Sequence, residues 1–551
     1  MGRQEKARGE RDFSVFPYTP RKVEVYDSTL RDGAQGENIS FSLEDKLLIA
    51  EKIDAVGIHY IEGGWPNPTN PKDLDFFRRI KECGCRNAKV TAFGSTRRAD
   101  RKPDQDPMLR TLLDANTEVI TIFGKSWELH VNEVLRISLD DNLRLIEDSV
   151  GFLISQGRRV FFDAEHFFDG YKVNPDYAVK TLLAAETGGA EILVLCDTNG
   201  GAVPDEIASS CDAVRGKLRT PFGIHCHNDA GFSAANTFTG VLHGAVQIQG
   251  TINGFGERCG NDNLCTTIPN LSLKLKVACL PDEMLTELME LSRFVSEVAN
   301  EFHNHRQPYV GESAFAHKGG AHIDGVIKNP RTFEHIDPEL VGNQRRFLLS
   351  DQSGSATVFA KLQMIYHDLE KKGPRVQAVL HELKIKENEG YQYEAAQGSF
   401  ELLAARIIDD YKPPFSLGGF RVITDRREDG SMISEATIKL LMDGQEEHTV
   451  AEGDGPVHAL NKALKKALNR FYPVISQVHL EDYKVRVISS NEGTEAKVRV
   501  LIESSDGVDA WGTVGVSENV IEASYIALVD SFSYKLVLDK RKAKLKHGKS
   551  T

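Results

Sequence analysis

Short runs of apolar and β-branched residues recur at intervals of about 30 residues through the first half of the chain. Runs of this kind predict strands, and the segments between them carry helical patterns. The eight predicted strands cover residues 23–27, 60–63, 89–93, 119–123, 159–164, 192–196, 222–227 and 246–251. Eight strands that alternate with helices over about 250 residues favour an α/β fold, a (β/α)8 TIM barrel.

A doubly wound sheet is the alternative architecture. It normally carries a Gly-x-Gly-x-x-Gly turn after its first strand, and this chain has Asp27-Ser-Thr-Leu-Arg-Asp-Gly33 at that position. The helix expected after this turn begins with a capping box at Ser42 and Asp45 and ends at Gly57. The barrel is therefore the better interpretation.

Composition excludes several classes of protein. A chain of 551 residues is too long for one core, and its net charge of −13 argues against a nucleic-acid surface. The 8 cysteines show no Cys-x-x-Cys spacing, so reduced thiols in a cytoplasmic protein are expected. Residues 1–12 are charged and do not form a signal peptide, and no apolar run is long enough to span a membrane.

Polar residues gather where the predicted strands end. They include Arg31, Asp32 and Gln35 after the first strand, Asp163, Glu165 and His166 at the fifth, Thr198 at the sixth, His225 and His227 at the seventh, and Asn253 to Asn261 after the eighth. The chemistry of a barrel lies at the carboxyl ends of its strands. These residues therefore predict one functional site.

His225 and His227 lie two residues apart in a predicted strand, so their side chains point to the same side. A bare His-x-His is more often a pair of solvated or core histidines, but the other strand ends favour a divalent metal site. The predicted ligands are Asp32, His225, His227 and Asn261. Nitrogen and oxygen ligation without a thiolate allows Mn²⁺, Mg²⁺, Co²⁺ or Zn²⁺.

Open coordination positions on such a metal suit chelation of a 2-oxo acid through its keto oxygen and carboxylate. Arg31 could then stabilise the developing oxyanion, although a surface ion pair is the alternative. Thr198 could donate its hydroxyl to the substrate carboxylate, or it could cap the following helix.

Three motifs resemble the metal-dependent Claisen-condensing lyases and synthases, the family that includes the 2-isopropylmalate, homocitrate and citramalate synthases. The motifs are Ser28-Thr-Leu-Arg-Asp-Gly-Ala-Gln35, His225-Cys-His-Asn-Asp229 and Asn253-Gly-Phe-Gly-Glu-Arg-Cys-Gly-Asn261. The segments at residues 121–130 and 163–170 resemble the citramalate branch, and the likeness runs from about residue 21 to 536.

The resemblance implies acetyl-CoA and pyruvate as substrates, with (R)-citramalate and CoA as products on the pyruvate route to isoleucine. It gives Asp32, His225, His227 and Asn261 as metal positions and Arg31 as the stabiliser of the enolate and oxyanion. Glu165 and His322 match residues implicated in proton transfer, and Arg31, Thr198, Gln35 and Asp324 are expected to bind substrate.

Residues 319–325 contain glycines on both sides of His322 and Asp324, and on their own they predict a flexible connection. The resemblance instead implies a linker subdomain that reaches the active site of a partner subunit, which requires a homodimer. Related enzymes usually carry Tyr where this chain has Phe333, so we assign Phe333 no chemical role.

The second half of the chain predicts two βββα units, an internal repeat. The first has strands at 420–424, 436–442 and 448–451 and a helix at 456–470, and the second has strands at 484–489, 496–503 and 510–516 and a helix at 518–531. The resemblance makes this a regulatory domain that binds an amino acid, isoleucine for the citramalate branch.

The predicted domains are an N-terminal tail (1–20), the catalytic barrel (21–290), linker subdomains (291–395), the regulatory domain (396–536) and a basic tail (537–551). Residues 540–549 of this tail are expected to be frayed, with an electrostatic contact as the alternative. Two alternatives remain at this point. The same chemistry could act on the 2-oxo acid of a 2-isopropylmalate or homocitrate synthase, because one methyl group is worth only about 1–3 kcal/mol of discrimination. A non-catalytic amino-acid sensor is the other alternative, and the retained ligand set and Arg31 argue against it.

Overall fold

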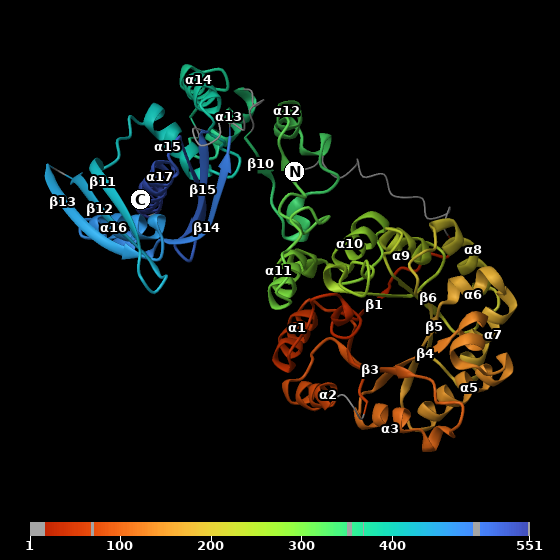
Figure 1. The fold of residues 1–551 in the computed structure, drawn as a ribbon. Helices are drawn as coiled ribbons and strands as arrows, with labels where there is room; N and C mark the ends of the chain where they lie inside the picture. Colours follow the sequence, from red (N-terminus) through yellow and green to blue (C-terminus); the bar gives the residue numbers. More distant parts are fainter. Residues whose placement is uncertain are drawn as a thin grey trace. The chain divides into compact units, whose positions relative to one another are not determined.

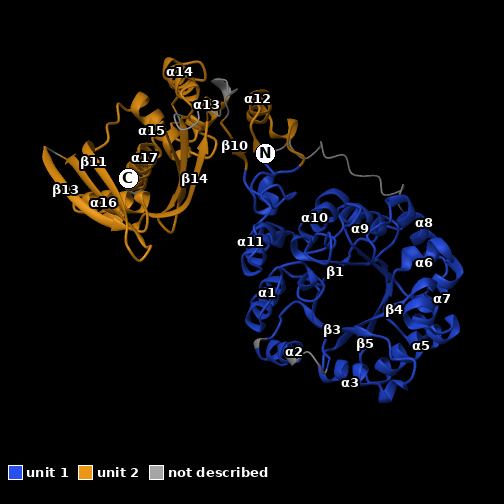
Figure 2. Ribbon diagram, viewed as in Figure 1, with its two compact units in different colours: residues 1–315, 336–344 blue, residues 316–335, 345–551 orange. Residues whose placement is uncertain are grey.

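The computed structural model describes residues 17–67, 71–349, 355–366, 368–442, 444–488 and 496–548. Most of the predicted N-terminal tail, residue 489 of a predicted strand and residues 549–551 lie outside these ranges. The chain divides into two compact units, residues 1–315 with 336–344 and residues 316–335 with 345–551 (Figure 2). Each unit is described by itself.

The first unit contains a closed barrel of parallel strands in the order β1 to β8, ringed by helices (Figure 1). This confirms the predicted barrel. The strands are β1 Glu24–Asp27, β2 Tyr60–Gly64, β3 Lys89–Ser95, β4 Val119–Lys125, β5 Arg159–Glu165, β6 Ile192–Asp197, β7 Phe222–Cys226 and β8 Gln247–Gly250. The helices are α1 Leu43–Ala55, α2 Pro71–Cys83, α3 Pro107–Asp114, α4 Glu128–His130, α5 Leu139–Ser155, α6 Phe167–Val173, α7 Pro175–Gly188, α8 Pro204–Arg215, α9 Ser233–Leu242, α10 Leu264–Pro269 and α11 Leu288–Val298.

Helix α1 shows why the barrel helices form where the pattern predicts them. The Ser42 hydroxyl accepts a hydrogen bond from Asp45 N, and the Asp45 carboxylate accepts one from Ser42 N, which completes the predicted capping box. Ile49, Ala50 and Ile53 are fully buried against the barrel core. The capping box thus sets where α1 begins, and its buried residues pack it against the barrel. A short loop then leads from α1 to β2.

Strand β7 ends at Cys226, one residue earlier than predicted. His227 lies just beyond it and forms an isolated backbone bridge with Asn261. The chain after β8 thus returns to the end of β7, because the glycine-rich loop at residues 253–261 folds back on itself. This return brings Asn261 to the carboxyl end of the barrel.

Helix α12, Gly320–Lys328, replaces the flexible connection that residues 319–325 predicted on their own, so that expectation was wrong. Ile323 and Val326 are buried on one side of it, and this apolar contact orders the segment despite its glycines. The same unit holds the short parallel pair β9 Ala316–His317 and β10 Arg346–Phe347, and the helices α13 Ser355–Gln363, α14 Pro374–Asn388 and α15 Gln397–Ile408.

The rest of the second unit consists of two βββα repeats with antiparallel sheets, as predicted. The first is β11 Phe415–Arg426, β12 Met432–Met442, β13 Gln445–Gly453 and α16 Pro456–Asn469, and the second is β14 His479–Val487, β15 Val498–Ser505, β16 Ala510–Ser517 and α17 Val520–Gly548. Both sheets and both helices contribute to one apolar core. Neither three-stranded sheet has to stand alone.

Helix α17 continues to Gly548, so the expectation of a frayed end was wrong for residues 540–548. Polar contacts hold the beginning of this extension. Arg541 Nη1 contacts Glu401 Oε2 at 2.5 Å, and Lys542 pairs with Asp509. Two of the basic residues of this segment, Arg541 and Lys542, are thus partners of acidic groups in the same unit.

Candidate functional site

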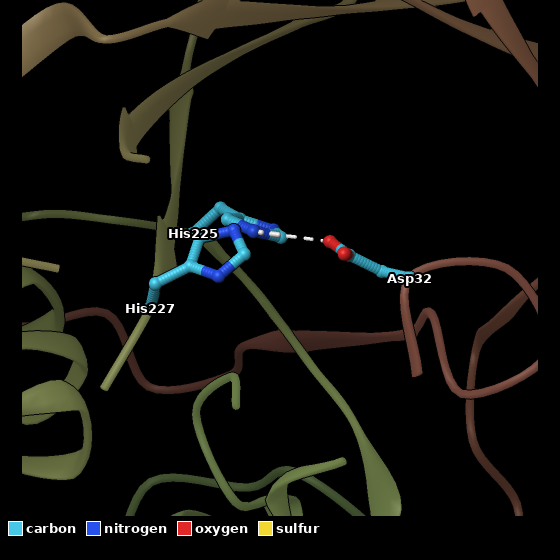
Figure 3. Close-up of side chains that lie close together, drawn as sticks. All are labelled: Asp32, His225 and His227. Carbon is cyan, nitrogen blue, oxygen red and sulfur yellow. Dashed lines mark ion pairs between the residues drawn. The ribbon is translucent and has the colours of Figure 1, made fainter. Parts of the chain in front are cut away.

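Asp32, His225 and His227 form a buried cluster at the carboxyl end of the barrel. Each offers one ligand atom, and these atoms lie within 4.8 Å of one another. His225 Nε2 lies 3.5 Å from Asp32 Oδ2, and the two imidazole centroids are 5.1 Å apart. Figure 3 shows Asp32, on the segment that follows β1, pointing toward the imidazoles of His225 in β7 and His227 just after it.

The protonation states of this cluster suit metal binding. Burial lowers the pKa of His225, and it lowers the pKa of His227 to about 4, so both rings are neutral near pH 7. Burial opposes ionisation of Asp32, but Arg31 and the two imidazoles outweigh it and lower the pKa of the carboxyl group. A neutral imidazole and an ionised carboxylate are the forms that bind a metal.

Asn261 is placed at this cluster by its backbone bridge to His227, and its Nδ2 donates a hydrogen bond to the Phe255 carbonyl oxygen at 3.1 Å. His227 Nδ1 and Asn261 Oδ1 are buried atoms without a hydrogen-bond partner among the described residues. A buried acceptor without a partner is costly unless a ligand satisfies it. The four side chains at the predicted ligand positions therefore fit a divalent cation.

The loop that carries Asn261 depends on glycine. Gly256 and Gly260 have φ angles of +155° and +89°, which side chains rarely adopt. A Cβ on Gly256 would overlap the Asn261 amide, and one on Gly260 would overlap the Gly254 carbonyl oxygen. The glycines of this motif thus allow the close return that places Asn261.

Arg31 is fixed on three sides. Its Nε donates to Glu62 Oε2 at 2.8 Å, its Nη1 lies 3.5 Å from Asp32 Oδ2, and its guanidinium stacks 3.7 Å from the centroid of the Phe93 ring. Burial opposes the charge, but Asp32 and Glu62 raise the pKa of Arg31. Only 13% of this side chain is exposed, so the alternative of a surface ion pair is wrong.

Glu62, Lys125 and Gln249 are site residues that sequence reasoning missed. Glu62 also accepts a hydrogen bond from the Tyr26 hydroxyl at 2.9 Å inside the barrel. Lys125 pairs with Glu165, which lies beside it in the register of β4 and β5. Gln249 Oε1 lies 3.0 Å from His225 Nδ1. The available signal was a charged or amide residue within a predicted strand, for Glu62 and Gln249, or just after one, for Lys125.

Glu165 and Thr198 also lie at strand ends of the first unit. The Thr198 hydroxyl accepts a hydrogen bond from His166 N at 2.9 Å, and α8 begins only at Pro204. The alternative that Thr198 caps the next helix is therefore wrong.

Gln35 is an exposed residue of the short 3-10 helix after Asp32. With Arg31 and Trp65 it lines a cavity of about 380 Å³. Trp65 packs edge-on against Phe93 at 5.7 Å between ring centroids, so one wall of this cavity is aromatic.

His322 and Asp324 belong to the second unit. The His322 ring stacks on Phe333, with centroids 4.1 Å apart. Asp324 accepts hydrogen bonds from Lys328 and Lys371, which lower its pKa to about 2. Phe333 thus packs against a residue to which the resemblance gives a role in proton transfer.

Family profiles match nearly the whole chain. The HMGL-like profile matches residues 22–321, the homocitrate synthase post-HMGL domain-like profile matches 309–390, and the LeuA allosteric (dimerisation) domain profile matches 394–536. None of the helices in the described ranges combines the length and apolar character needed to cross a membrane.

Full-length relatives narrow the family. The chain is 54% identical over 515 residues to an (R)-citramalate synthase of Geobacter sulfurreducens, covering 93% of this chain and 97% of the relative. It is 52% identical to an (R)-citramalate synthase of Aquifex aeolicus over 94% and 98% of the two chains. A probable 2-isopropylmalate synthase of Methanopyrus kandleri is 28% identical over 93% and 97%. The chain therefore belongs to the (R)-citramalate synthase family of acyltransferase enzymes, within the larger HMGL-like family.

Proposed function

We propose that this protein condenses acetyl-CoA with pyruvate and water to form (R)-citramalate and CoA. The observation that carries the proposal is the buried cluster of Asp32, His225 and His227 in a chain 54% identical to an (R)-citramalate synthase. Identity to the 2-isopropylmalate synthase relative is about half as high, at 28%, which favours pyruvate over the larger 2-oxo acid.

Asp32, His225, His227 and Asn261 would hold a divalent cation, one of Mn²⁺, Mg²⁺, Co²⁺ or Zn²⁺. When bound, the cation would polarise the keto group of the 2-oxo acid toward attack. The neutral imidazoles and the partnerless Asn261 Oδ1 support this assignment.

Arg31 stabilises negative charge on the reacting oxygen. Its guanidinium cannot lose its proton in this setting, and Glu62 and Phe93 prevent it from swinging away. A fixed cation that is already oriented costs little reorganisation when charge develops. Thr198 and Gln35, at the same end of the barrel, are proposed to bind the substrate.

Glu165 is proposed to take part in the proton transfers that convert the thioester methyl group to a nucleophile. It lies at the carboxyl end of β5, and its ion pair with Lys125 holds the carboxylate in place. Proton transfer of this kind requires a group within hydrogen-bond reach of the substrate in a plausible pose.

His322 and Asp324 are proposed to serve the barrel of a partner subunit, His322 in proton transfer and Asp324 in substrate binding. The match to a dimerisation domain at residues 394–536 supports a homodimer. Stacking on Phe333 limits the orientations that the His322 ring can adopt.

The regulatory repeats are proposed to bind isoleucine, the end product of the route that citramalate enters. The family profile for this domain is described as allosteric, which supports a regulatory ligand without naming it. Six cysteines of the barrel unit are free thiols, which supports the reducing cytoplasm as the place of action: Cys196, Cys211, Cys226, Cys259, Cys265 and Cys279.

A panel of 2-oxo acids tests the proposal. Purified full-length protein, acetyl-CoA and Mn²⁺ are mixed with pyruvate, 2-oxoisovalerate or 2-oxoglutarate, and free CoA is titrated with a thiol reagent. We expect release above the acid-free control with pyruvate, and we expect the product to be identified as citramalate by mass spectrometry.

Release with 2-oxoisovalerate or 2-oxoglutarate but not with pyruvate would move the assignment to a 2-isopropylmalate or homocitrate synthase. Calorimetric binding of isoleucine without turnover on any of the three acids would instead indicate a sensor.

A further inference from the structure

We propose that Gln249, held by Asp163, positions His225 for metal binding by fixing which imidazole nitrogen carries the proton. The inference rests on the proposed metal site, and it is independent of which 2-oxo acid the protein uses. Gln249 and Asp163 thus act through His225 and need not touch the metal or the substrate.

The three side chains form a continuous chain of hydrogen bonds across the barrel. Gln249 on β8 lies directly beside His225 on β7 in the strand register, and its Oε1 is 3.0 Å from His225 Nδ1. Gln249 Nε2 donates to Asp163 Oδ1 on β5 at 3.1 Å. The residues are 1%, 5% and 4% exposed in the order Gln249, His225, Asp163, so water does not compete for these contacts.

This chain of hydrogen bonds selects one tautomer of His225. In these two contacts Gln249 turns its NH₂ group toward Asp163 and its carbonyl oxygen toward His225. A carbonyl oxygen only accepts, so the neutral ring carries its proton on Nδ1.

The consequence lies at the other ring nitrogen. With the proton on Nδ1, the lone pair of Nε2 is available, and Nε2 is the atom that lies 3.5 Å from Asp32 Oδ2. Hydrogen-bond partners of this kind orient the ring of a metal-binding histidine and strengthen it as a ligand.

Gln247 provides a matched comparison two residues earlier on the same strand. It is fully buried, and neither of its side-chain amide atoms has a hydrogen-bond partner among the described residues. Residue type and burial on β8 are thus not enough to connect a glutamine to the cluster. Comparing Gln249 with Gln247 separates the effect of the hydrogen bonds of Gln249 from the effect of burial.

The test measures metal affinity directly. Chelator-stripped full-length wild type, Gln249→Met, Gln249→Glu and Gln247→Met are titrated with Mn²⁺ by calorimetry. We expect Gln249→Met to bind about 10–100-fold more weakly than wild type. Gln249→Glu keeps an acceptor for His225 Nδ1 and should bind more tightly than Gln249→Met, and Gln247→Met should match wild type.

A second pair of variants covers the case in which Gln249→Met does not fold, as judged by circular dichroism. Asp163→Asn keeps an acceptor oxygen for Gln249 and should retain Mn²⁺ affinity, whereas Asp163→Leu should lose it by a similar factor. Equal affinities within this pair, an unchanged affinity in folded Gln249→Met, or an equal loss in Gln247→Met would overturn the inference. Failure of wild type to bind Mn²⁺ would reject the metal site itself.

Discussion

Arg31 shows how the site is built at the scale of single residues. Glu62 and Phe93 come from β2 and β3, and together they hold the guanidinium beside Asp32. A buried cation with such fixed partners mainly stabilises the negative charge that develops during the reaction. Burial of a second residue, His59, which directly precedes β2, makes the stability of the barrel depend on pH.

For Arg31→Ala, we expect kcat to fall by roughly two orders of magnitude or more, since charge stabilisation at the reacting oxygen is lost. Mn²⁺ affinity should change little, because Arg31 is not a ligand. Steady-state kinetics and metal titration of the same preparation check both values. A matching loss of metal binding and folding would mean that Arg31 is structural.

For Glu62→Gln, we expect a smaller fall in kcat than for Arg31→Ala, because the amide keeps an acceptor for Arg31 Nε but removes the charge. The KM for pyruvate should rise less than kcat falls if Arg31 acts mainly in the transition state. Kinetics on both variants give the comparison. A kcat equal to that of wild type would show that Glu62 does not fix Arg31.

His59 should make the barrel less stable in mild acid. Its Nδ1 accepts a hydrogen bond from Val25 N at 3.2 Å, and burial, with Lys22 adding, lowers its pKa from 6.5 to about 4. The unfolded chain therefore binds more protons than the folded chain between these values, and the free energy of unfolding falls as pH decreases from 6.5 to 4.

His59→Asn retains an acceptor oxygen but does not titrate. We expect its urea midpoint to improve relative to wild type as pH is lowered through this window. A difference between the two proteins that stays constant with pH would contradict the prediction.

At the scale of elements, the loop of residues 253–261 is the part on which the site depends most. It leaves β8 and returns to the end of β7, where Asn261 bridges to His227. The return needs positive φ angles at Gly254, Gly256 and Gly260. The geometry of this loop therefore links backbone conformation to the ligand set.

For Gly260→Ala, we expect the free energy of unfolding to fall by roughly 1–3 kcal/mol, because alanine is strained at this φ and its Cβ meets the Gly254 carbonyl. Mn²⁺ affinity should fall with it, as Asn261 is the next residue. Urea unfolding and metal titration test both effects. Gly216→Ala is the control, since Gly216 has a φ of −76° and open space around its Cα.

At the scale of the whole molecule, the proposed catalytic residues are divided between two units. Arg31 lies in the barrel unit and His322 in the unit that also carries the regulatory repeats. Under the proposal that His322 serves the barrel of a partner subunit, a ligand of the repeats could influence the position of His322, because both belong to the same unit.

Mixed dimers of Arg31→Ala and His322→Ala should therefore regain activity when the two variants are co-expressed. If His322 acts in trans, each mixed dimer has one intact site, and random pairing restores about a quarter of wild-type activity. The specific activity of the co-expressed protein, compared with that of each variant alone, measures this. Absence of any recovery would mean that both residues act within one subunit.

Much of the architecture could be predicted because its signals are local. The capping box at Ser42 and the alternation of strands and helices predicted the barrel, and two successive sets of three strand-like runs and a helix predicted the repeats. The predictions of a flexible connection at residues 319–325 and of a frayed end from residue 540 were wrong. Burial of Ile323 and Val326, and ion pairs of Arg541 and Lys542, order segments whose composition indicates flexibility.

The sequence by itself determined which residues stand at strand ends, because period and turn chemistry are properties of neighbouring residues. Hence Asp32, His225, His227 and Asn261 could be named as candidate ligands from the order of residues in the chain. Only the tertiary structure decided which side chains contact the site residues. Glu62 accepts a hydrogen bond from Arg31, and Gln249, which donates to Asp163, contacts His225. Those contacts join residues of different strands far apart in the sequence, and the closure of the barrel alone sets their distances.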